Sequence, residues 1–422
     1  MSLSRPRVLV IAEAANPEWV SVPLVGWSLA AALHRQTDVH IVTQIRNRDA
    51  FLRAGMVEGR DFTAIDSEAV AAPMYRAAEV LRMGKGRGWT TVTAIAALSY
   101  PYFERLVWKR FGDDIRAKRF DIVHRVTPLS PTTASTLAPK VAAAGVPFVL
   151  GPLNGGVPWP RGFDAERRRE REWLSYVRGI YKLNPQLRRT HAAAALIIAG
   201  SRHTASEIPE RFQDKVVWLP ENAIDPTRFN LIAPQDTTLP LRACFVGRLV
   251  PYKGPHILLD AIAPFARSGQ TVLDIIGEGP MLPELTAQAD SLGIADTVTF
   301  HGHLPHQQVQ QILAAANLLT FPSIREFGGG VVLEAMALGV VPMVVDYAGP
   351  GELVTAETGF AIPLGTRQQI AARMEQALAD VLRDPTRLIT MAAAARRTVQ
   401  DHYTWDAKAA QIIAMYRDVL KP

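Results

Sequence analysis

Short apolar runs alternate with longer stretches of helical periodicity from one end of the chain to the other. In the first half these runs lie at residues 8–11, 39–42, 121–124, 147–150, 195–198 and 216–219. Between them the sequence predicts helices, including one that begins near Pro23 and an alanine-rich one over residues 132–144. Near-continuous apolar strands separated by helices are typical of a parallel sheet that is covered on both faces.

The same alternation restarts after a loop rich in Asp, Thr and Pro at residues 232–240. Apolar runs follow at residues 243–246, 272–276, 298–300, 318–321 and 342–345. The 422-residue chain is also too long for one typical core. We therefore predict an α/β protein with two doubly wound, Rossmann-like domains that face a cleft, at residues 1–225 and 226–400. A C-terminal helix at residues 401–422 is expected to pack back on the N-terminal domain.

Two loops of the second half combine glycines with charged residues directly after predicted strands. In the first loop Gly247 permits a tight turn, and Arg248 and Lys253 precede a predicted helix. Two cations at a helix N-terminus suit a diphosphate without a metal ion, although two solvated bases would give the same pattern. In the second loop Gly277 allows a flat ligand to approach the backbone closely, but an ordinary turn is the simpler interpretation.

The most informative segment follows the predicted strand at residues 318–321. Glu326 stands in a loop, three glycines follow from Gly328, and Glu334 falls within the next predicted helix. The N–H groups of consecutive glycines at a helix start cradle phosphate or sugar oxygens. A carboxylate on an apolar helix is costly unless it has a partner, and vicinal hydroxyls such as those of ribose supply one. A capping residue plus a surface glutamate is the weaker interpretation.

These glutamates, eight positions apart, together with Gly247-Arg248 and Lys253-Gly254, resemble the retaining family-4 glycosyltransferases of the GT-B fold, or glycosyl transferases group 1. The likeness covers nearly the whole chain and is densest at residues 245–365. Residues 222–229 at the domain junction and residues 335–339 after the second glutamate also match, with Ala223 where the family has Gly. The resemblance implies a GT-B enzyme that uses a nucleotide-sugar donor.

The resemblance also implies roles for single residues. Arg248 and Lys253 would bind the donor diphosphate and Glu326 would contact the donor sugar, so these three are the catalytic candidates. Glu334 would bind the ribose hydroxyls. The remaining donor-binding candidates surround the sugar, the phosphates and the base: Gly247, Gly277, Phe327, Gly328, Gly329, His303 and Leu304.

The first domain departs from the family in its early glycine loop and in lacking a histidine near the sugar. Gly26 stands in the altered loop, and Asn154 and Gly155 occupy the stretch where many relatives have the histidine. These residues are expected to approach the donor from the opposite wall. His124, after a predicted strand, either faces an acceptor or is a buried structural histidine, and the second interpretation is favoured.

Composition narrows the class of protein. The chain is 48% hydrophobic and 20% charged, and its one cysteine, Cys244, excludes an internal disulfide framework. No apolar run is long enough to span a bilayer, so we expect a cytoplasmic protein. The net charge of +6 favours an acidic partner, but no nucleic-acid module is present and nucleic acid is not expected.

Basic and aromatic residues are interleaved in two clusters of the first domain. This pattern suits peripheral association with the anionic inner face of a membrane, and solvated helix faces with aromatic residues turned to the core explain it equally well. Cluster 1 comprises Arg161, Arg167, Arg168, Arg169, Arg171, Trp173, Tyr176, Arg178, Tyr181, Lys182, Arg188 and Arg189. Cluster 2 comprises Lys85, Arg87, Trp89, Tyr100, Tyr102, Phe103, Arg105, Trp108, Lys109, Arg110, Arg116, Lys118 and Arg119.

We therefore predict a retaining glycosyltransferase that moves a sugar from a UDP-, GDP- or ADP-sugar to a glycan or lipid-linked acceptor in bacterial polysaccharide or glycoconjugate synthesis. No cofactor and no metal ion are expected, because no Asp-x-Asp pair ends a predicted strand. The alternatives are a nucleotide-sugar epimerase of the same fold and a non-catalytic sugar-nucleotide binding protein. A phosphorylase would need a cofactor lysine pocket that the sequence does not reveal.

Overall fold

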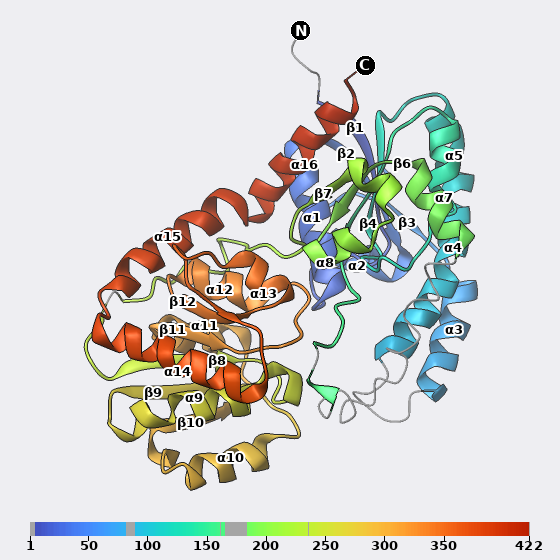
Figure 1. The fold of residues 1–422 in the computed structure, drawn as a ribbon. Helices are drawn as coiled ribbons and strands as arrows, with labels where there is room; N and C mark the ends of the chain where they lie inside the picture. The colour runs from blue at the N-terminus through green and yellow to red at the C-terminus, as the bar shows by residue number, and fades with distance from the viewer. Residues whose placement is uncertain (1–4, 82–88, 161, 165–183, 235, 422) are drawn as a thin grey trace. The chain divides into compact units, whose positions relative to one another are not determined.

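The computed structural model describes residues 5–81, 89–160, 162–164, 184–234 and 236–421, with the backbone alone for residues 75–81 and 89–98. These residues form two compact units, each with its own parallel sheet (Figure 1). Unit 1 holds the described residues within Met1–Gly156, Leu174–Glu221 and Lys408–Pro422. Unit 2 holds residues 157–160 and 162–164 together with the described part of Asn222–Ala407.

The sheet of unit 1 has seven parallel strands in the order β3-β2-β1-β4-β5-β6-β7. The strands are β1 (Arg7–Ala12), β2 (Asp38–Gln44), β3 (Phe62–Ile65), β4 (Ile122–Thr127), β5 (Phe148–Leu153), β6 (Ala194–Ala199) and β7 (Val216–Trp218). The helices are α1 (Val22–Gln36), η1 (Ile45–Asn47), α2 (Arg48–Arg53), α3 (Glu68–Leu81), α4 (Trp89–Arg116), α5 (Ala138–Ala143), α7 (Pro185–Ala193), α8 (Arg202–Glu207), η3 (Glu210–Lys215) and α16 (Trp405–Val419). The strand order reverses between β1 and β4, and ligands of such sheets bind beyond the carboxyl ends of the strands near this point.

The sheet of unit 2 has six parallel strands in the order β10-β9-β8-β11-β12-β13. The strands are β8 (Leu241–Val246), β9 (Thr271–Ile276), β10 (Val298–Gly302), β11 (Leu318–Phe321), β12 (Val341–Asp346) and β13 (Phe360–Pro363). The helices are η4 (Pro251–Lys253), α9 (Pro255–Arg267), α10 (Leu282–Ser291), η5 (Ala295–Thr297), α11 (His306–Ala314), α12 (Gly330–Leu338), α13 (Ala348–Leu353), α14 (Arg367–Arg383) and α15 (Arg387–His402). β11 and all but the last residue of β12 are buried, as the continuous apolar runs predict.

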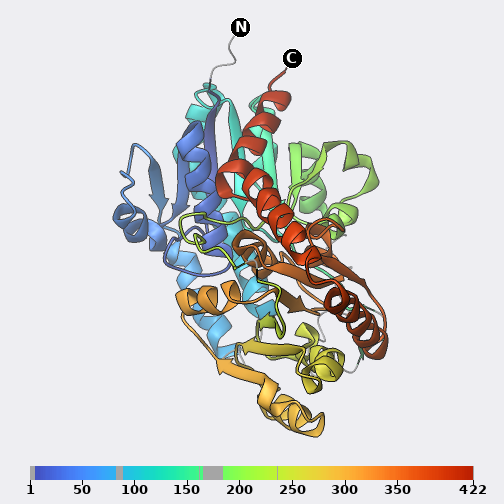
Figure 2. The same cartoon turned by 90° about the vertical axis from the view of Figure 1, so that its left-hand side faces the viewer.

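The last helix, α16, completes unit 1 although it comes after all of unit 2 in the sequence. Figures 1 and 2 both show it beside α1, so the two ends of the chain lie in the same unit. The Tyr416 hydroxyl lies 2.5 Å from Nδ1 of His124 on β4, and both side chains are fully buried. At the start of the helix Lys408, also buried, donates to the carbonyl of Pro220 and faces the carboxylate of Glu221.

The predicted fold class is confirmed: two doubly wound Rossmann-like units carry a C-terminal helix that returns to the first unit. The unit boundaries differ from the predicted divisions at residues 225 and 400, because the chain passes between units at residues 221–222 and 407–408. Residues 157–160 and 162–164 also belong with unit 2, since Val157 and Phe163 are 1% and 2% exposed and Phe163 joins the core of that unit.

Two further details depart from the sequence prediction. The alanine-rich helix begins at Ala138 rather than near residue 132. The preceding turn is bound to the buried carboxylate of Glu104, which accepts from Ser135, from Thr136 and from the N–H of Leu137. The short strands β3 and β13 were not predicted. β3 has two half-buried residues among its four, and β13 two exposed ones, so neither gives a continuous apolar run.

Candidate functional site

The loops that follow β8, β9 and β10 in unit 2 are bonded to one another by backbone hydrogen bonds. The N–H of Gly247 donates to the carbonyl of Ile276 (2.9 Å), and the N–H of Gly277 donates to the carbonyl of Gly302 (2.8 Å). The N–H of Leu249 in turn donates to the carbonyl of Glu278 (2.9 Å). Hydrogen bonds between backbone groups thus hold the three neighbouring loops together at the carboxyl edge of the sheet. We call these three bonded loops the floor of the site.

The glycines of this floor serve the packing of the protein against itself. Gly277 has φ +137°, and a Cβ on it would lie 2.0 Å from the carbonyl oxygen of Gly247. The ordinary-turn interpretation accounts for a glycine here, because the neighbouring loop occupies the space that a Cβ would need. Gly247 has no positive φ, and a Cβ there would meet Phe245 and Phe321 at an ordinary 3.5 Å. The tight turn expected at Gly247 is thus not what requires a glycine.

Lys253 and Glu326 meet on this floor as an ion pair. Lys253 ends η4, directly before α9, and Glu326 lies in the loop after β11. Their side chains are 15% and 21% exposed. Burial, and secondly the repulsion of Arg248, lowers the pKa of Lys253 to about 8. Arg248 itself is exposed, so the structure brings three of the four predicted charged residues within electrostatic range of one another.

The glycine-rich turn after Glu326 leads into α12. Gly329 caps the helix with φ +59°, and Gly330 is its first helical residue. The first turn contains no acidic residue. Within the described residues, no carbonyl or side chain accepts from the N–H groups of Gly328 and Gly329. A helix N-terminus with free N–H groups favours an anion, as the sequence predicts for this segment.

Glu334 lies in the second turn of α12, beside α11. Its carboxylate is 3.8 Å from Nε2 of His306, the first residue of α11, and the His306 ring packs edge-on against Phe229. No contact among the described residues joins Glu334 to Lys253 or Glu326. Glu334 and His306 therefore form a second polar pair, separate from the pair of Lys253 and Glu326. Both side chains are partly exposed on the surface of unit 2.

The segment expected to contact the base lies after β10. His303 is exposed and Leu304 is half-buried. The N–H of His303 donates to the carboxylate of Glu278 (3.3 Å), which orients the turn at Gly302. This leaves the His303 ring on the surface of the same edge of the sheet.

Arg325, next to Glu326, was missed from the sequence although it is 6% exposed. Its guanidinium lies over the rings of Trp159 and Phe327, at 5.1 and 5.5 Å from their centroids. Its Nε donates to the carbonyl of Val157 (3.3 Å). Arg325 thus binds residues 157–159 to the loop that carries Glu326 and Phe327. A basic residue directly before the first glutamate was the available signal.

The first-unit candidates take structural positions. His124 is fully buried, with Nδ1 at Tyr416 and Nε2 2.6 Å from the carbonyl of Gly151. Burial lowers its pKa to about 4. Both ring nitrogens are occupied, so the expectation that His124 faces an acceptor is corrected in favour of the structural interpretation. A Cβ on Gly26 would lie 2.2 Å from the carbonyl oxygen of Ala14, so this glycine lets α1 pack closely on the loop after β1.

Asn154 and Gly155 follow β5 and belong to a buried polar group. The Asn154 side-chain oxygen accepts from the N–H of Gly155 (2.8 Å) and from Ser201 (3.1 Å). Asn154 is 6% exposed and its amide faces Glu221. Burial raises the pKa of Glu221, against the opposing effects of Asn154 and Lys408. The structure of unit 1 assigns Asn154 to this internal network.

The two basic clusters are described only in part. Of cluster 1, Arg188 and Arg189 are exposed, and the other residues lie outside the described ones. Of cluster 2, Lys85 and Arg87 lie outside the described residues, as does the Trp89 side chain. The remaining basic side chains of cluster 2 are exposed, whereas Tyr100 and Phe103 belong to the core of unit 1. For these two aromatic residues the solvated-helix interpretation is the correct one.

Among the described residues, no helix has the length and hydropathy needed to cross a bilayer. In the same residues no three His, Cys, Asp or Glu side chains are grouped as metal ligands are.

Residues 235–395 match the family model Glycosyl transferases group 1. The chain is 34% identical over 182 residues to a D-inositol 3-phosphate glycosyltransferase of Segniliparus rotundus, covering 42% of this chain and 40% of that protein. It is 30% identical over 227 residues to a glycogen synthase of Mycobacterium tuberculosis, covering 52% and 53% of the two chains. The chain therefore spans about half or less of the length of these relatives.

Solved structures resemble nearly the whole chain. A glycosyltransferase of Rickettsia africae aligns with a TM-score of 0.61 at 12% identity, covering 99% of both chains. The HepE protein of Anabaena, in complex with UDP and glucose, aligns with a TM-score of 0.55 at 16% identity, covering 98% of this chain and 100% of its own. At this identity the likeness establishes the fold, which is that of the GT-B proteins.

Proposed function

We propose that this chain, which carries a glycosyl transferases group 1 domain at residues 235–395, transfers a sugar from a nucleotide-diphosphate sugar to a hydroxyl acceptor with retention of configuration. The observation that carries the proposal is the partly buried ion pair of Lys253 and Glu326, with Arg248 in electrostatic range. A cation and a carboxylate at one strand edge match the two ends of such a donor, its diphosphate and its sugar.

The donor diphosphate binds between Arg248, Lys253 and the N-terminus of α12. When it binds, the Lys253 ammonium turns from Glu326 to phosphate oxygens, and the Glu326 carboxylate becomes free to accept from donor-sugar hydroxyls. The N–H groups of Gly328 and Gly329 donate to oxygens at the same place. Glu334, with the His306 ring beside it, accepts from the ribose hydroxyls.

Catalysis in this proposal is electrostatic. As the bond from the sugar to the diphosphate breaks, negative charge grows on the leaving phosphate, and Arg248, Lys253 and the helix N-terminus stabilise it. The acceptor hydroxyl attacks from the face that the phosphate leaves, and a phosphate oxygen takes its proton. We propose that no metal ion takes part, since two cationic side chains neutralise the diphosphate. Transfer that survives EDTA would agree with this, and transfer that EDTA abolishes would not.

The acceptor is proposed to be a glycan or a lipid-linked glycan in the synthesis of a polysaccharide or glycoconjugate, on the cytoplasmic side of the membrane. The name of one similar protein, a GDP-mannose-dependent mannosyltransferase that acts on a phosphatidylinositol monomannoside, supports an acceptor of this kind. The exposed basic residues of α4 and α7 support contact with an anionic membrane face. Flotation with liposomes that contain or lack anionic lipid tests that contact.

A panel of donors tests the function. Thermal shifts with UDP-, GDP- and ADP-sugars identify the base, and Lys253→Ala and Glu334→Ala proteins are expected to lose the shift. Turnover is then measured with and without acceptor, and the anomeric configuration of the product is read by NMR. Donor conversion without any acceptor would identify an epimerase, and binding without turnover would identify a binding protein. Folded Lys253→Ala and Glu334→Ala proteins that bind every donor as the parent does would refute the proposal.

A further inference from the structure

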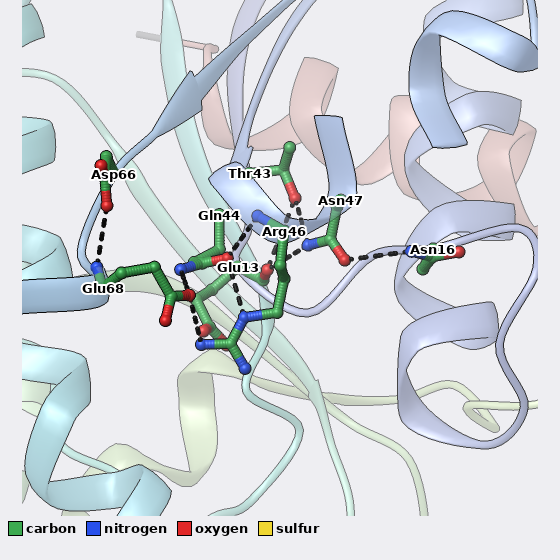
Figure 3. Close-up of polar contacts among 8 residues, drawn as sticks. All are labelled: Glu13, Asn16, Thr43, Gln44, Arg46, Asn47, Asp66 and Glu68. Carbon is green, nitrogen blue, oxygen red and sulfur yellow. Dashed lines mark hydrogen bonds and ion pairs between the residues drawn. The ribbon is translucent and has the colours of Figure 1, made fainter. Parts of the chain in front are cut away.

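Eight polar residues gather where β1, β2 and β3 of unit 1 reach their carboxyl ends (Figure 3). We call them the Glu13 cluster; its members are Glu13, Asn16, Thr43, Gln44, Arg46, Asn47, Asp66 and Glu68. They come from three neighbouring strand ends, and the outermost carboxylates, Glu13 and Glu68, are 55 residues apart in the sequence. The candidate donor residues of unit 2 have no part in this cluster, and no motif of the sequence marks it.

Buried amides form the base of the Glu13 cluster. Asn47 is 1% exposed, and its Nδ2 donates to the carbonyl of Glu13 (2.9 Å) while its Oδ1 accepts from Asn16 (3.3 Å). Gln44 is fully buried, and its Oε1 accepts from the N–H (2.7 Å) and from Nε (2.8 Å) of Arg46. The amides thereby fix the backbone at Glu13 and the direction of the Arg46 side chain.

The charged ends of the cluster reach toward solvent. Nη2 of Arg46 lies 3.1 Å from the Glu68 carboxylate, and these side chains are 25% and 38% exposed. Gln44 donates to the same Glu68 carboxylate. Glu13 is half-buried, and among the described residues no hydrogen bond or ion pair reaches its carboxylate. Burial raises the pKa of Glu13, Arg46 opposes this, and Glu68 adds to it, so the three charges act on one another.

The charges of Glu13, Arg46 and Glu68 favour one class of ligand over another. Two carboxylates stand against one guanidinium, so the exposed face of these three residues is negative on balance. A hydroxyl donates to the Glu13 carboxylate without adding negative charge beside it. A phosphate or carboxylate group would place like charge against Glu13 and Glu68, which costs affinity and serves as discrimination against such ligands. A fixed side-chain frame also lowers the cost of binding, because little rotamer freedom remains to be lost.

We propose that the Glu13 cluster binds the acceptor through vicinal hydroxyls of an uncharged sugar unit and discriminates against a phosphorylated one, with Glu13 as the residue that accepts from the acceptor hydroxyls. This inference rests on the proposed function, because it names the class of acceptor that the transferase takes.

Pairs of probes that differ only in one phosphate test the inference. The acceptors are D-glucose and D-mannose against D-glucose 6-phosphate and D-mannose 6-phosphate, each with the donor that the thermal-shift panel identifies. Binding is followed by saturation-transfer NMR and transfer by mass spectrometry. The parent protein is expected to bind at least one neutral sugar at least 10-fold better than its phosphate.

The Glu13→Gln and Glu68→Gln proteins separate recognition from folding. Both substitutions are expected to weaken binding of the neutral sugar about 10-fold and to reduce the ratio of its affinity to that of the sugar phosphate. Donor affinity and acceptor-independent donor hydrolysis should stay unchanged. Glu18→Gln is the matched control, because Glu18 is an exposed carboxylate of the same unit that pairs with Arg53. A purely structural role of Glu13 would change donor hydrolysis or thermal stability without narrowing the preference.

Three results would overturn the inference. These are a phosphate ester bound as well as its neutral partner, no binding of any neutral sugar by a protein that hydrolyses the donor, and an unchanged preference in Glu13→Gln. In each of them the donor still binds and turns over, so the proposed function survives. A protein that binds no nucleotide sugar fails at the proposed function instead, and that failure is visible before any acceptor is added.

Discussion

The loops after β8, β9 and β10 of unit 2 are joined to one another by backbone hydrogen bonds, whereas those after β1, β2 and β3 of unit 1 are joined mainly by side chains. In unit 2, loops bond to one another through their N–H and carbonyl groups, and Lys253 and Glu326 stand on this floor. In unit 1, the amides of Gln44 and Asn47 hold Glu13 in place. Both units use the same kind of doubly wound parallel sheet, so the difference lies in the loops at the two edges.

The close packing of backbone in the loops of unit 2 restricts which residues fit there. Gly277 and Gly254 take positive φ, and a Cβ on either would lie within 2.5 Å of a neighbouring carbonyl oxygen. Such positions impose a spacing of glycines and charges that is visible in a sequence. The side chains of the Glu13 cluster impose no comparable spacing, since they come from three separate strand ends. The sequence therefore shows the spacing of glycines and charges in unit 2, whereas the Glu13 cluster has no comparable pattern.

Removing the Lys253 cation should give the largest effect. For Lys253→Met we expect kcat/KM of transfer to fall about 10²–10³-fold, because a cation aimed at the leaving phosphate is lost. Arg383→Met is the control, since Arg383 is a 73% exposed base of the same unit that pairs with Asp380. Steady-state kinetics with the identified donor decide the matter, and a loss below 5-fold would contradict the placement of Lys253 at the diphosphate.

Adding a Cβ between the bonded loops of unit 2 should have the second-largest effect. It lowers the stability of the fold rather than the rate of transfer. Gly277→Ala combines a disfavoured φ with a clash against Gly247 and is expected to destabilise unit 2 by about 3 kcal/mol. Gly269→Ala is matched for a positive φ but has no atom within 4 Å, so about 1–2 kcal/mol is expected. Calorimetric unfolding measures both. Equal losses would mean that the interlocked loops add nothing beyond the φ penalty.

Neutralising Glu334 should weaken donor binding with little effect on folding. For Glu334→Gln the Kd of the nucleotide sugar is expected to rise roughly 10-fold, as for a charged hydrogen-bond partner worth about 1.5 kcal/mol. Titration calorimetry with nucleoside diphosphate and with its 2′,3′-dideoxy form isolates the ribose. Glu357→Gln, at an exposed position of the same unit, should leave both affinities unchanged.

The pH dependence of donor binding is a second test of the role of Lys253. Burial and Arg248 lower the pKa of Lys253 to about 8, so the ammonium is charged below pH 8 and neutral above it. If only the charged form binds the diphosphate, the Kd should rise by about 10-fold between pH 7 and pH 9. Isothermal titration across this range measures it, and Lys253→Met should show a flat profile. A rise that persists in the variant would assign the titration to another group.

The smallest effect is expected in the core of unit 1. Tyr416→Phe leaves Nδ1 of buried His124 without its partner and should cost about 1–2 kcal/mol, or a few degrees in Tm. Tyr102→Phe, at a half-buried position on α4, should change Tm by less than a degree. Donor affinity should stay the same in both variants. A loss of donor binding in Tyr416→Phe would show that the framework of unit 1 also affects the donor.

The sequence predicts those features that follow from local spacing. The strands with continuous apolar runs, the glycines at 328–330 and the helix that contains Glu334 are all where the pattern indicates. The reason for the glycine at position 277 is not visible, because its neighbour Gly247 is 30 residues away and meets it only in the folded sheet. The same holds for Arg325, whose aromatic neighbours come from another part of the chain.

The Glu13 cluster marks the limit of prediction most clearly. Glu13, Arg46 and Glu68 are ordinary surface residue types, and none forms a motif with its sequence neighbours. Their proximity depends on the order of β1, β2 and β3 in the sheet and on the buried amide of Gln44. β3 is short and only half apolar, so the third element of the cluster was absent from the predicted fold.

The position of α16 in the sequence affects how the protein is made. Unit 2 has all its strands once Pro363 has emerged from the ribosome, but unit 1 still lacks its closing helix. The side chains of His124 and Glu221 gain their partners only when Tyr416 and Lys408 have been synthesised, and both follow every strand of unit 2 in the sequence. A nascent chain that has emerged as far as Ala407 therefore carries every strand of unit 2, while unit 1 still lacks most of the helix that completes it.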